Sequence, residues 1–328
     1  MKLNPLVSII IPTRNSAQYL EECLSAIHNQ SYKNIEILIS DGLSTDNTLI
    51  IAKKYNARIV INNKILAEPG LSLGMKSAKG DILIVVATDN IFKENNAIES
   101  VVKVFSNKNI YAAYPKHESG KGDSLYTKYV NTFTDPFNHF VYGYAANPRT
   151  FNKIYKTIYH DDLYDLYDFK SSKISPILAL AQGFSIRKEF LQIKRNEMDD
   201  IEPILNLISS GEKIAYLHSV NLYHHTIKDI GHFIRKQRWA TKNALMGEKY
   251  GINSRTHLLT PIQRLMVYIF PFYSISIIFP CINSLLHLIF DGERMWLLHP
   301  YMTFLSAISI LFEYVKIKTG FINNISRS

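Results

Sequence analysis

The sequence predicts an α/β protein with a mixed, mainly parallel sheet flanked by helices, followed by membrane-associated helices. Two observations predict this. Over the first 115 residues, short apolar runs alternate with helical patterns, which is typical of a parallel sheet with right-handed crossovers. Near the C-terminus, residues 265–290 and 295–312 contain no Asp, Glu, Lys or Arg. The first of these runs is long enough to cross a bilayer and the second is borderline.

Strands are expected at short apolar runs, which are residues 7–11, 35–40, 57–61, 81–86 and 110–114. The first run is β-branched and uninterrupted, as expected for a strand buried on both faces. A helix is predicted after Ser16, which can cap it, because apolar residues recur at helical spacing. These are Leu20, Cys23, Leu24 and Ile27. Further helices are expected at 48–55 and 97–105.

The sequence predicts no definite helix or strand between residues 116 and 180. Within it, HDDLYDLYDFK (160–170) carries four Asp. We interpret it as a solvated loop, with metal binding as the alternative. Secondary structure is expected again at 177–191. A helix is then expected over 199–211, strands within 213–225, and a basic amphipathic helix over 230–250.

Composition excludes several functional classes. The chain has 328 residues and a net charge of +9 (37 Lys+Arg minus 28 Asp+Glu). Its two cysteines, without a CxxC, are too few for a disulfide scaffold or a cysteine zinc site. The basic residues are dispersed and no recognition module is present, so nucleic acid is not expected as a partner. The first strand is followed by PTRNSA rather than G-x-G-x-x-G, and no Walker loop occurs.

Three polar clusters follow predicted strands, at Pro12-Thr13-Arg14-Asn15, at Asp41 to Asp46, and at Thr88-Asp89-Asn90. Ligands of parallel sheets bind at the carboxyl ends of the strands. Any one cluster can be an ordinary polar turn, but three at one edge indicate a binding site.

The residues around these clusters resemble family 2 glycosyltransferases of the GT-A fold. The chain has VSIIIPTRN, then NQSYKNIEILISDGLSTDNT, with further likeness at GDILIVVATDN, AQGFSIRKEFL and DDIEPILNLISSGEKIAYL. The resemblance is close over about 1–115. It implies transfer of a sugar, with inversion, from a nucleotide-diphosphate sugar carrying UDP or GDP.

The resemblance also implies roles for the strand-end residues. Asp41 and Asp46 would face the base and ribose of the donor, with the residues of Pro12 to Asn15 and Thr88 beside them. Asp46 can equally act as a helix cap. Residues 67–81 look shorter than the corresponding helix of the family, which puts donor contacts from that helix in doubt.

A divalent metal, Mg²⁺ or Mn²⁺, is expected at the donor diphosphate, because charge develops there as the bond breaks. The family motif is D-x-D, whereas this chain has Ala87-Thr88-Asp89. By resemblance Asp89 would hold the metal, joined by His224 or His225. A surface histidine pair is the alternative.

On the acceptor side, Asp199-Asp200 stands where the family has Glu-Asp, and Asp200 would be the general base. Two carboxylates at a helix N-terminus also suit the macrodipole. Gln182 and Gly183 resemble the acceptor-side segment of the family. Arg238 and Trp239, within RKQRW, are predicted to meet the diphosphate or an acceptor ring, with binding to anionic lipid as the alternative.

The expected domains are a catalytic domain over 1–225, a basic helix and linker over 226–261, and a membrane-associated hairpin and tail over 262–328. Basic residues flank the apolar runs and favour the cytoplasmic face of the cell membrane. Prolines within the runs leave a re-entrant or interfacial hairpin open. Membrane lipid is therefore an expected partner, and the acceptor is expected to be a lipid-linked, polyprenyl-type saccharide of envelope polysaccharide or glycoprotein glycan synthesis.

Three alternatives stay open. Ala87 allows a pseudoenzyme that binds a nucleotide sugar without turnover. Bare polyprenyl phosphate is an alternative acceptor, which would need little base catalysis. A sugar nucleotidyltransferase is disfavoured, because PTRNSAQYL is not a glycine-rich loop with basic residues.

Overall fold

The computed structural model describes residues 4–181, 183–191, 201–246 and 258–319. The chain divides into two compact units, one formed by Met1–Gly120 with Pro148–His225 and the other by Lys121–Asn147 with Thr226–Ser328. The second unit thus includes residues 121–147, which the sequence analysis placed within the catalytic domain.

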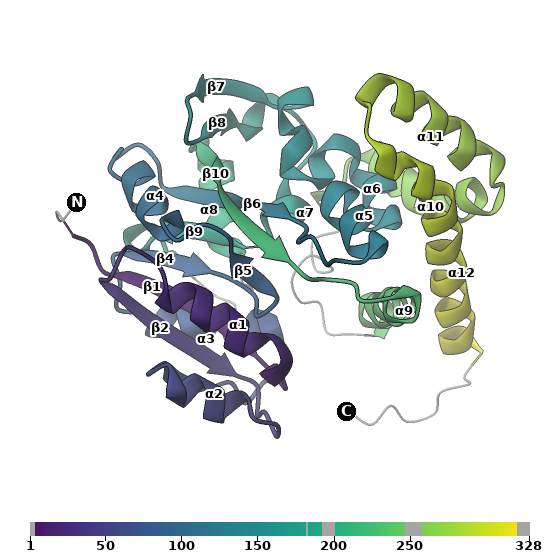
Figure 1. Ribbon diagram of the computed structural model, residues 1–328. Coiled ribbons are helices and arrows are strands. Elements are labelled where there is room, and N and C mark those ends of the chain that lie inside the picture. The colour runs from purple at the N-terminus through teal and green to yellow at the C-terminus, as the bar shows by residue number, and fades with distance from the viewer. Residues whose placement is uncertain (1–3, 182, 192–200, 247–257, 320–328) are drawn as a thin grey trace. The chain divides into compact units, whose positions relative to one another are not determined.

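The first unit contains a ten-stranded mixed sheet with helices on its faces (Figure 1). The strands are β1 (Val7–Thr13), β2 (Ile35–Asp41), β3 (Arg58–Ile61), β4 (Ile82–Val85), β5 (Asn90–Phe92), β6 (Ala112–Glu118), β7 (Lys156–His160), β8 (Asp165–Asp168), β9 (Phe184–Arg187) and β10 (Ile214–His224). Its helices are α1 (Ala17–His28), α2 (Thr48–Lys54), α3 (Ala67–Ser77), α4 (Ala97–Val104), α7 (Ile177–Leu180) and α8 (Glu202–Ser210).

The strand order is β3-β2-β1-β4-β9-β6-β10-β8-β7, with β5 paired to β10. The strands β3, β2, β1 and β4 are parallel, as the alternating pattern predicts. Antiparallel β9 then inserts between β4 and β6. Because β9 opposes both neighbours, β6 runs in the same direction as β4, and β10 is parallel to β6.

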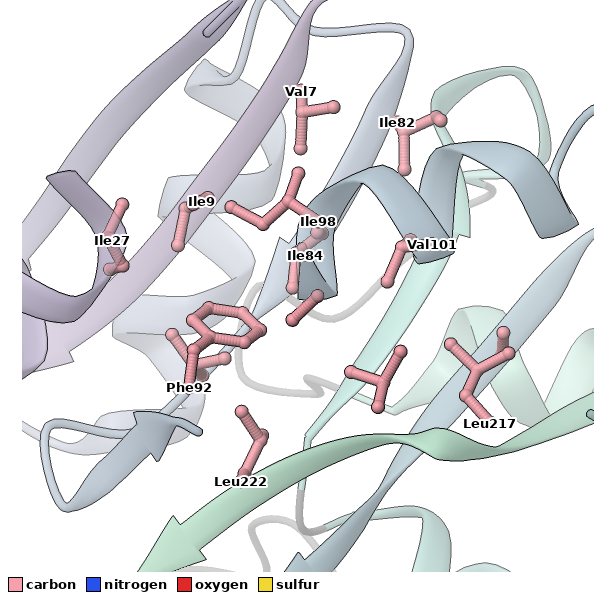
Figure 2. Close-up of a cluster of buried hydrophobic side chains, with 14 of the residues drawn as sticks. Val7, Ile9, Ile27, Ile82, Ile84, Phe92, Ile98, Val101, Leu217 and Leu222 are labelled. Atoms are coloured by element: carbon pink, nitrogen blue, oxygen red, sulfur yellow. The ribbon is translucent and has the colours of Figure 1, made fainter. Parts of the chain in front are cut away.

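The alternation of side chains along β1 explains how both faces of the sheet are covered. Val7, Ile9 and Ile11 join a buried cluster with residues of α1 and α4, part of which Figure 2 shows. Ile10 points to the opposite face, toward α3. There, a Cβ on Gly74 would lie 2.4 Å from Ile10 Cγ2, so α3 requires a glycine to pack this closely.

The expectation of a solvated loop at 160–170 is wrong in part. Residues 165–168 form β8, which pairs antiparallel with both β7 and β10. The two strands expected within 213–225 form the single strand β10, whose pairing with β6 shifts register between Leu217 and Asn221.

The second unit is helical. Its helices are α5 (Leu125–Phe133), α6 (Pro136–Tyr142), α9 (Ile230–Met246), α10 (Pro261–Ile275), α11 (Ile278–Asp291) and α12 (His299–Lys318). Trp296, in the turn before α12, is buried with Phe133 and Phe233 in a small core. The helix α9 packs along α12, where the Ser306 hydroxyl donates to Gln237 Oε1 at 2.8 Å.

The two apolar runs of the sequence take different forms. The first run is a bent pair, since α10 and α11 meet at 97°. At the break, Ile277 has a φ of 58°, which is uncommon for a β-branched residue. The second run lies in Arg294–Lys318, which among the described residues is the one helical segment long and apolar enough to cross a membrane unbroken.

Candidate active site

Several parallel strands of the first unit end at one edge of the sheet. Because β1, β2, β4, β6 and β10 run in the same direction, their carboxyl ends meet there. The polar residues at or just beyond these ends are Thr13, Asp41, Asp89, His117 and His224. This is the edge at which open α/β sheets bind ligands.

The end of β2 is fastened to the end of β1 by the carboxylate of Asp41. Asp41 is fully buried, and its Oδ1 accepts hydrogen bonds from Thr13 Oγ1 at 3.0 Å and Ser44 Oγ at 2.5 Å. Its Oδ2 accepts from the Ser44 backbone N–H at 2.9 Å. Two of the residues predicted to contact the donor, Asp41 and Thr13, are therefore direct partners, and these hydrogen bonds satisfy the buried Asp41 carboxylate.

The loops that follow β1 and β2 are also bonded to each other. The Asn15 side-chain oxygen accepts from the Thr45 backbone N–H at 2.8 Å, and the Asn15 N–H donates to Ser44 Oγ at 2.9 Å. Asn15 has a φ of 48°, a conformation that asparagine tolerates better than most residues. Arg14 beside it is exposed, and Pro12 is partly buried in β1.

Asp46 performs the capping role that the sequence left open. Its Oδ2 accepts from the backbone N–H of Ala17, the first residue of α1. Its Oδ1 accepts from the backbone N–H and the hydroxyl of Thr48, the first residue of α2. Burial acts to raise its pKa, but these hydrogen bonds hold the pKa of Asp46 below its usual value. A contact with a donor ribose stays a prediction.

Asp89, which lies between β4 and β5, is close to His224 of β10. Its Oδ2 is 3.9 Å from His224 Nε2. The pairing of β10 with β5 brings them together, since His224 stands opposite Asn90. His225 approaches differently, because its backbone N–H donates to the Asp89 carbonyl. The structure thus places the His224 ring beside the Asp89 carboxylate, and a metal-binding role of either histidine stays a prediction. Thr88, beside Asp89, is partly exposed.

A third residue, His117 at the end of β6, was missed by the sequence analysis. Its ring packs edge-on against the His224 ring at 5.4 Å between centroids. His117 is buried, and its Nε2 has no hydrogen-bond partner. Burial lowers the pKa of His117 to about 3, with a smaller lowering by His224 and an opposing effect of Asp89. His117 is therefore a neutral, buried ring that packs against His224 at this edge.

Several predicted residues lie outside this cluster or outside the described residues. Asp199, Asp200 and Gln182 are not among the described residues. Gly183 is described and has a φ of +126°, and a Cβ there would lie 3.1 Å from the Val85 carbonyl oxygen of β4. The fold itself therefore requires glycine at this position.

The two acceptor-side candidates on α9 lie in the helical unit. Arg238 Nε donates to Glu313 Oε2 of α12 at 2.8 Å, and its guanidinium stacks over Phe312 at 4.6 Å. Trp239 is 60% exposed. Arg238 thus has a packing role within this unit, while the predicted acceptor contact of both residues stays untested.

Comparison with known proteins decides the family. The family model described as "Glycosyl transferase family 2" matches residues 8–170. This chain belongs to glycosyltransferase family 2. Glycosyltransferase GlyG of Streptococcus pneumoniae is 35% identical over 99 residues, 28% of this chain and 33% of the relative. A second relative, of Methanococcus voltae, is named dolichyl N-acetyl-alpha-D-glucosaminyl phosphate 3-beta-D-2,3-diacetamido-2,3-dideoxy-beta-D-glucuronosyltransferase. It is 34% identical over 108 residues, 30% of this chain and 33% of the relative.

These matches span about a third of the length of the curated relatives. Among solved structures, the mannosyltransferase PcManGT of Pyrobaculum calidifontis, in complex with GDP-Man and Mn²⁺, is similar with a TM-score of 0.54. The similarity covers 95% of this chain and 88% of that one at 14% identity. At this identity the likeness shows the shared GT-A fold, which the family 2 resemblance predicted.

Proposed function

We propose that this family 2 member is an inverting glycosyltransferase. It would move a sugar from a UDP- or GDP-linked donor to a lipid-linked, polyprenyl-type saccharide in envelope polysaccharide or glycoprotein glycan synthesis. The observation that carries the proposal is the pairing of Asp89 with His224 at the carboxyl edge of the sheet, beside the Thr13–Asp41 pair. These residues would supply polar contacts for a nucleoside and donor atoms for a metal on a diphosphate.

The residues present fit a divalent metal. Asp89 supplies an oxygen and His224 a nitrogen 3.9 Å away, close enough for one ion to touch both at ~2.0–2.2 Å each. When bound, the metal would neutralise charge on the departing nucleoside diphosphate. A donor set with imidazole favours Mn²⁺ over Mg²⁺, which prefers oxygen ligands.

The chain's own residues supply the rest of the proposed chemistry. Asp41, held rigid by Thr13 and Ser44, would orient the base without losing conformational entropy on binding. The exposed Arg14 beside it carries a positive charge for the diphosphate. Asp200 would take the proton of the acceptor hydroxyl, which is a poor nucleophile until deprotonated.

The exposed apolar face of α10 and α11 supports a membrane-bound acceptor. On α10, the exposed large apolar residues recur at helical spacing; they include Ile262, Leu265, Tyr268 and Phe272. The α11 helix continues this with a similar set that includes Phe279, Ile282, Leu286 and Phe290. Large exposed apolar residues gathered on neighbouring helices mark an interaction site. We infer that it enters lipid, with the catalytic unit on the cytoplasmic face.

A specific observation favours a second candidate. Ala87 stands where the family has the first Asp of its metal motif, so the chain can be a pseudoenzyme that binds nucleotide sugar without turnover. The retained Asp89–His224 pair argues against this.

Turnover by the detergent-purified protein tests these alternatives. UDP- and GDP-sugars are screened with Mn²⁺, Mg²⁺ or EDTA, with membrane lipid extract as acceptor. Metal-dependent release of nucleoside diphosphate supports the enzyme, whereas tight donor binding without turnover on any acceptor supports the pseudoenzyme. Loss of turnover in Asp200→Asn favours a sugar hydroxyl as nucleophile, while unchanged turnover favours bare polyprenyl phosphate.

A further inference from the structure

A second group of metal-binding side chains lies on the strands β7, β8 and β10. His160 is the last residue of β7, Asp165 the first of β8, and His218 lies within β10. One potential ligand atom from each lies within 4.8 Å of the other two. None of these residues belongs to the site at Asp89. The sequence offered metal binding only as an alternative for residues 160–170, which include His160 and Asp165.

The strand register explains why the three side chains meet. His160 stands directly opposite Asp165 in the β7–β8 pair, and Asp165 stands opposite Tyr216 in the β8–β10 pair. Opposite residues share a face of the sheet, and so do residues two apart on one strand. His218 therefore falls on the same face as Tyr216, Asp165 and His160. The rings of His160 and His218 are 5.7 Å apart at their centroids.

The hydrogen bonds around the group resemble those that support metal ligands. His218 Nε2 is 2.9 Å from the Asp161 carbonyl oxygen, so Nε2 donates and Nδ1 keeps the lone pair. Metal-binding histidines almost always donate their second N–H in this way. His160 Nδ1 and Asp165 Oδ1 are 2.5 Å apart, so the ring N–H donates to the carboxylate, and metal binding would displace this proton.

The loop that connects β7 to β8 is held in place for this arrangement. The Asp161 carboxylate accepts hydrogen bonds from the backbone N–H groups of Leu163 and Tyr164 and from the Tyr159 hydroxyl. The Ser219 hydroxyl in turn donates to the Leu163 carbonyl at 2.9 Å. The Asp161 carbonyl that orients His218 is therefore on a loop whose conformation is fixed from both sides.

The group is separate from the Asp89 site. His218 and His224 lie six residues apart along β10, which corresponds to roughly 20 Å of strand. One ion cannot serve both places.

We propose that His160, Asp165 and His218 form a second metal site, which binds Zn²⁺ and fastens the β7–β8 hairpin to β10. Two imidazoles and one carboxylate are a ligand set that zinc accepts, with water in the fourth position. Mg²⁺, which prefers oxygen ligands, is disfavoured here. The role is structural and does not depend on the proposed transferase activity.

The test uses the full chain, purified without a polyhistidine tag and stripped with a chelator. Co²⁺ replaces Zn²⁺ as a spectroscopic probe, because tetrahedral Co²⁺ absorbs in the visible range. The titration is made in the parent and in an Asp89→Asn/His224→Gln variant that removes the other candidate site. We expect the tetrahedral Co²⁺ band in both proteins, and a rise in the midpoint of thermal unfolding of roughly 5 °C with saturating Zn²⁺.

Two single variants test the histidine ligands, and a third is the control. His160→Ala and His218→Ala should each weaken Zn²⁺ binding about 10- to 100-fold and remove the Co²⁺ band. His28→Ala, which replaces an exposed histidine on α1, should change neither. His160 is also exposed, so its variant is expected to fold. Absence of a tetrahedral band in the parent, or an unchanged band in His160→Ala, overturns the proposal.

Discussion

The Asp89 carboxylate and the His224 ring nitrogen lie 3.9 Å apart, although 135 positions separate them in the chain. The contact arises because β10 pairs with β5 immediately after Asp89. The sheet therefore builds a mixed oxygen and nitrogen donor pair where the sequence shows one isolated carboxylate and a pair of histidines.

If this pair holds the catalytic metal, substitution of either residue should reduce metal-dependent turnover. Asp89→Asn and His224→Gln are each expected to lower metal-dependent turnover by about 10²–10³-fold and to raise the Mn²⁺ concentration needed for half-maximal rate. Steady-state assays over a Mn²⁺ range measure both effects. Glu22→Gln, which neutralises an exposed carboxylate on α1 of the same unit, is the matched control and should behave as the parent does. Full activity of His224→Gln would contradict the pairing.

Because of His117, the free energy of unfolding should decrease as the pH falls. Its pKa is about 3 in the folded state against an ordinary 6.5, so the unfolded chain binds a proton that the folded chain rejects. Its effect is absent above pH 6.5, and stability is lost as pH falls from 6.5 toward 3, at up to about 1.4 kcal/mol per pH unit.

Chemical denaturation of metal-free protein at several pH values checks this. His117→Gln should show a shallower fall in the free energy of unfolding than the parent, while His28→Gln should keep the parent's slope. Equal slopes in parent and His117→Gln would show that the His117 ring is protonated normally.

The sequence predicted the elements whose signals are local. The β1 run of Val7 to Ile11 and the α1 spacing of Leu20, Cys23, Leu24 and Ile27 reflect burial along one segment, and the structure confirms both. The insertion of β9 between β4 and β6 was not predicted. It depends on pairing between segments about a hundred residues apart, which leaves no periodic mark in either segment.

The site was predictable to the same extent. Strand-end clusters identified Thr13, Asp41 and Asp89 because polar residues follow buried runs. His117 was missed because β6 was expected to end at residue 114, three residues before it. The available signal was the polar KHESG stretch after that strand. Likewise, hydropathy identified 265–290 as apolar but did not locate its 97° bend, although Pro271 and Pro280 had indicated an interrupted span.

Gly183 should be needed for stability irrespective of any acceptor. Gly183→Ala places a Cβ 3.1 Å from the Val85 carbonyl oxygen at a φ of +126°. We therefore expect the free energy of unfolding to fall by about 1–3 kcal/mol. The midpoint of thermal unfolding measures it. Gly122→Ala, where a Cβ meets nothing within 4 Å, is the matched control. Comparable stability of the two variants would mean that the glycine serves substrate approach alone.

The apolar face of α10 and α11 should govern vesicle binding. Phe272 and Phe290 are 79% and 80% exposed, and burying each in lipid contributes roughly 1.5–3 kcal/mol. The double variant Phe272→Gln/Phe290→Gln is therefore expected to lower the vesicle partition coefficient at least about 100-fold. Flotation with anionic vesicles measures this. Ile50→Gln, at an exposed apolar residue on α2, should float like the parent, and unchanged flotation of the double variant would exclude this face as the lipid contact.

Arg238 should act on the helical unit through Glu313. Glu313 is 4% exposed, so Arg238→Ala leaves a buried carboxylate without its 2.8 Å partner and is expected to cost about 3–5 kcal/mol. Glu313→Gln should cost less, because it removes the charge itself, and the double variant should lie close to Glu313→Gln. Thermal unfolding in detergent gives this double-mutant cycle, and Trp239→Ala, which alters the exposed neighbour, serves as control. Additive losses in the cycle, or loss of turnover in Arg238→Ala with unchanged stability, would instead place the guanidinium on a substrate.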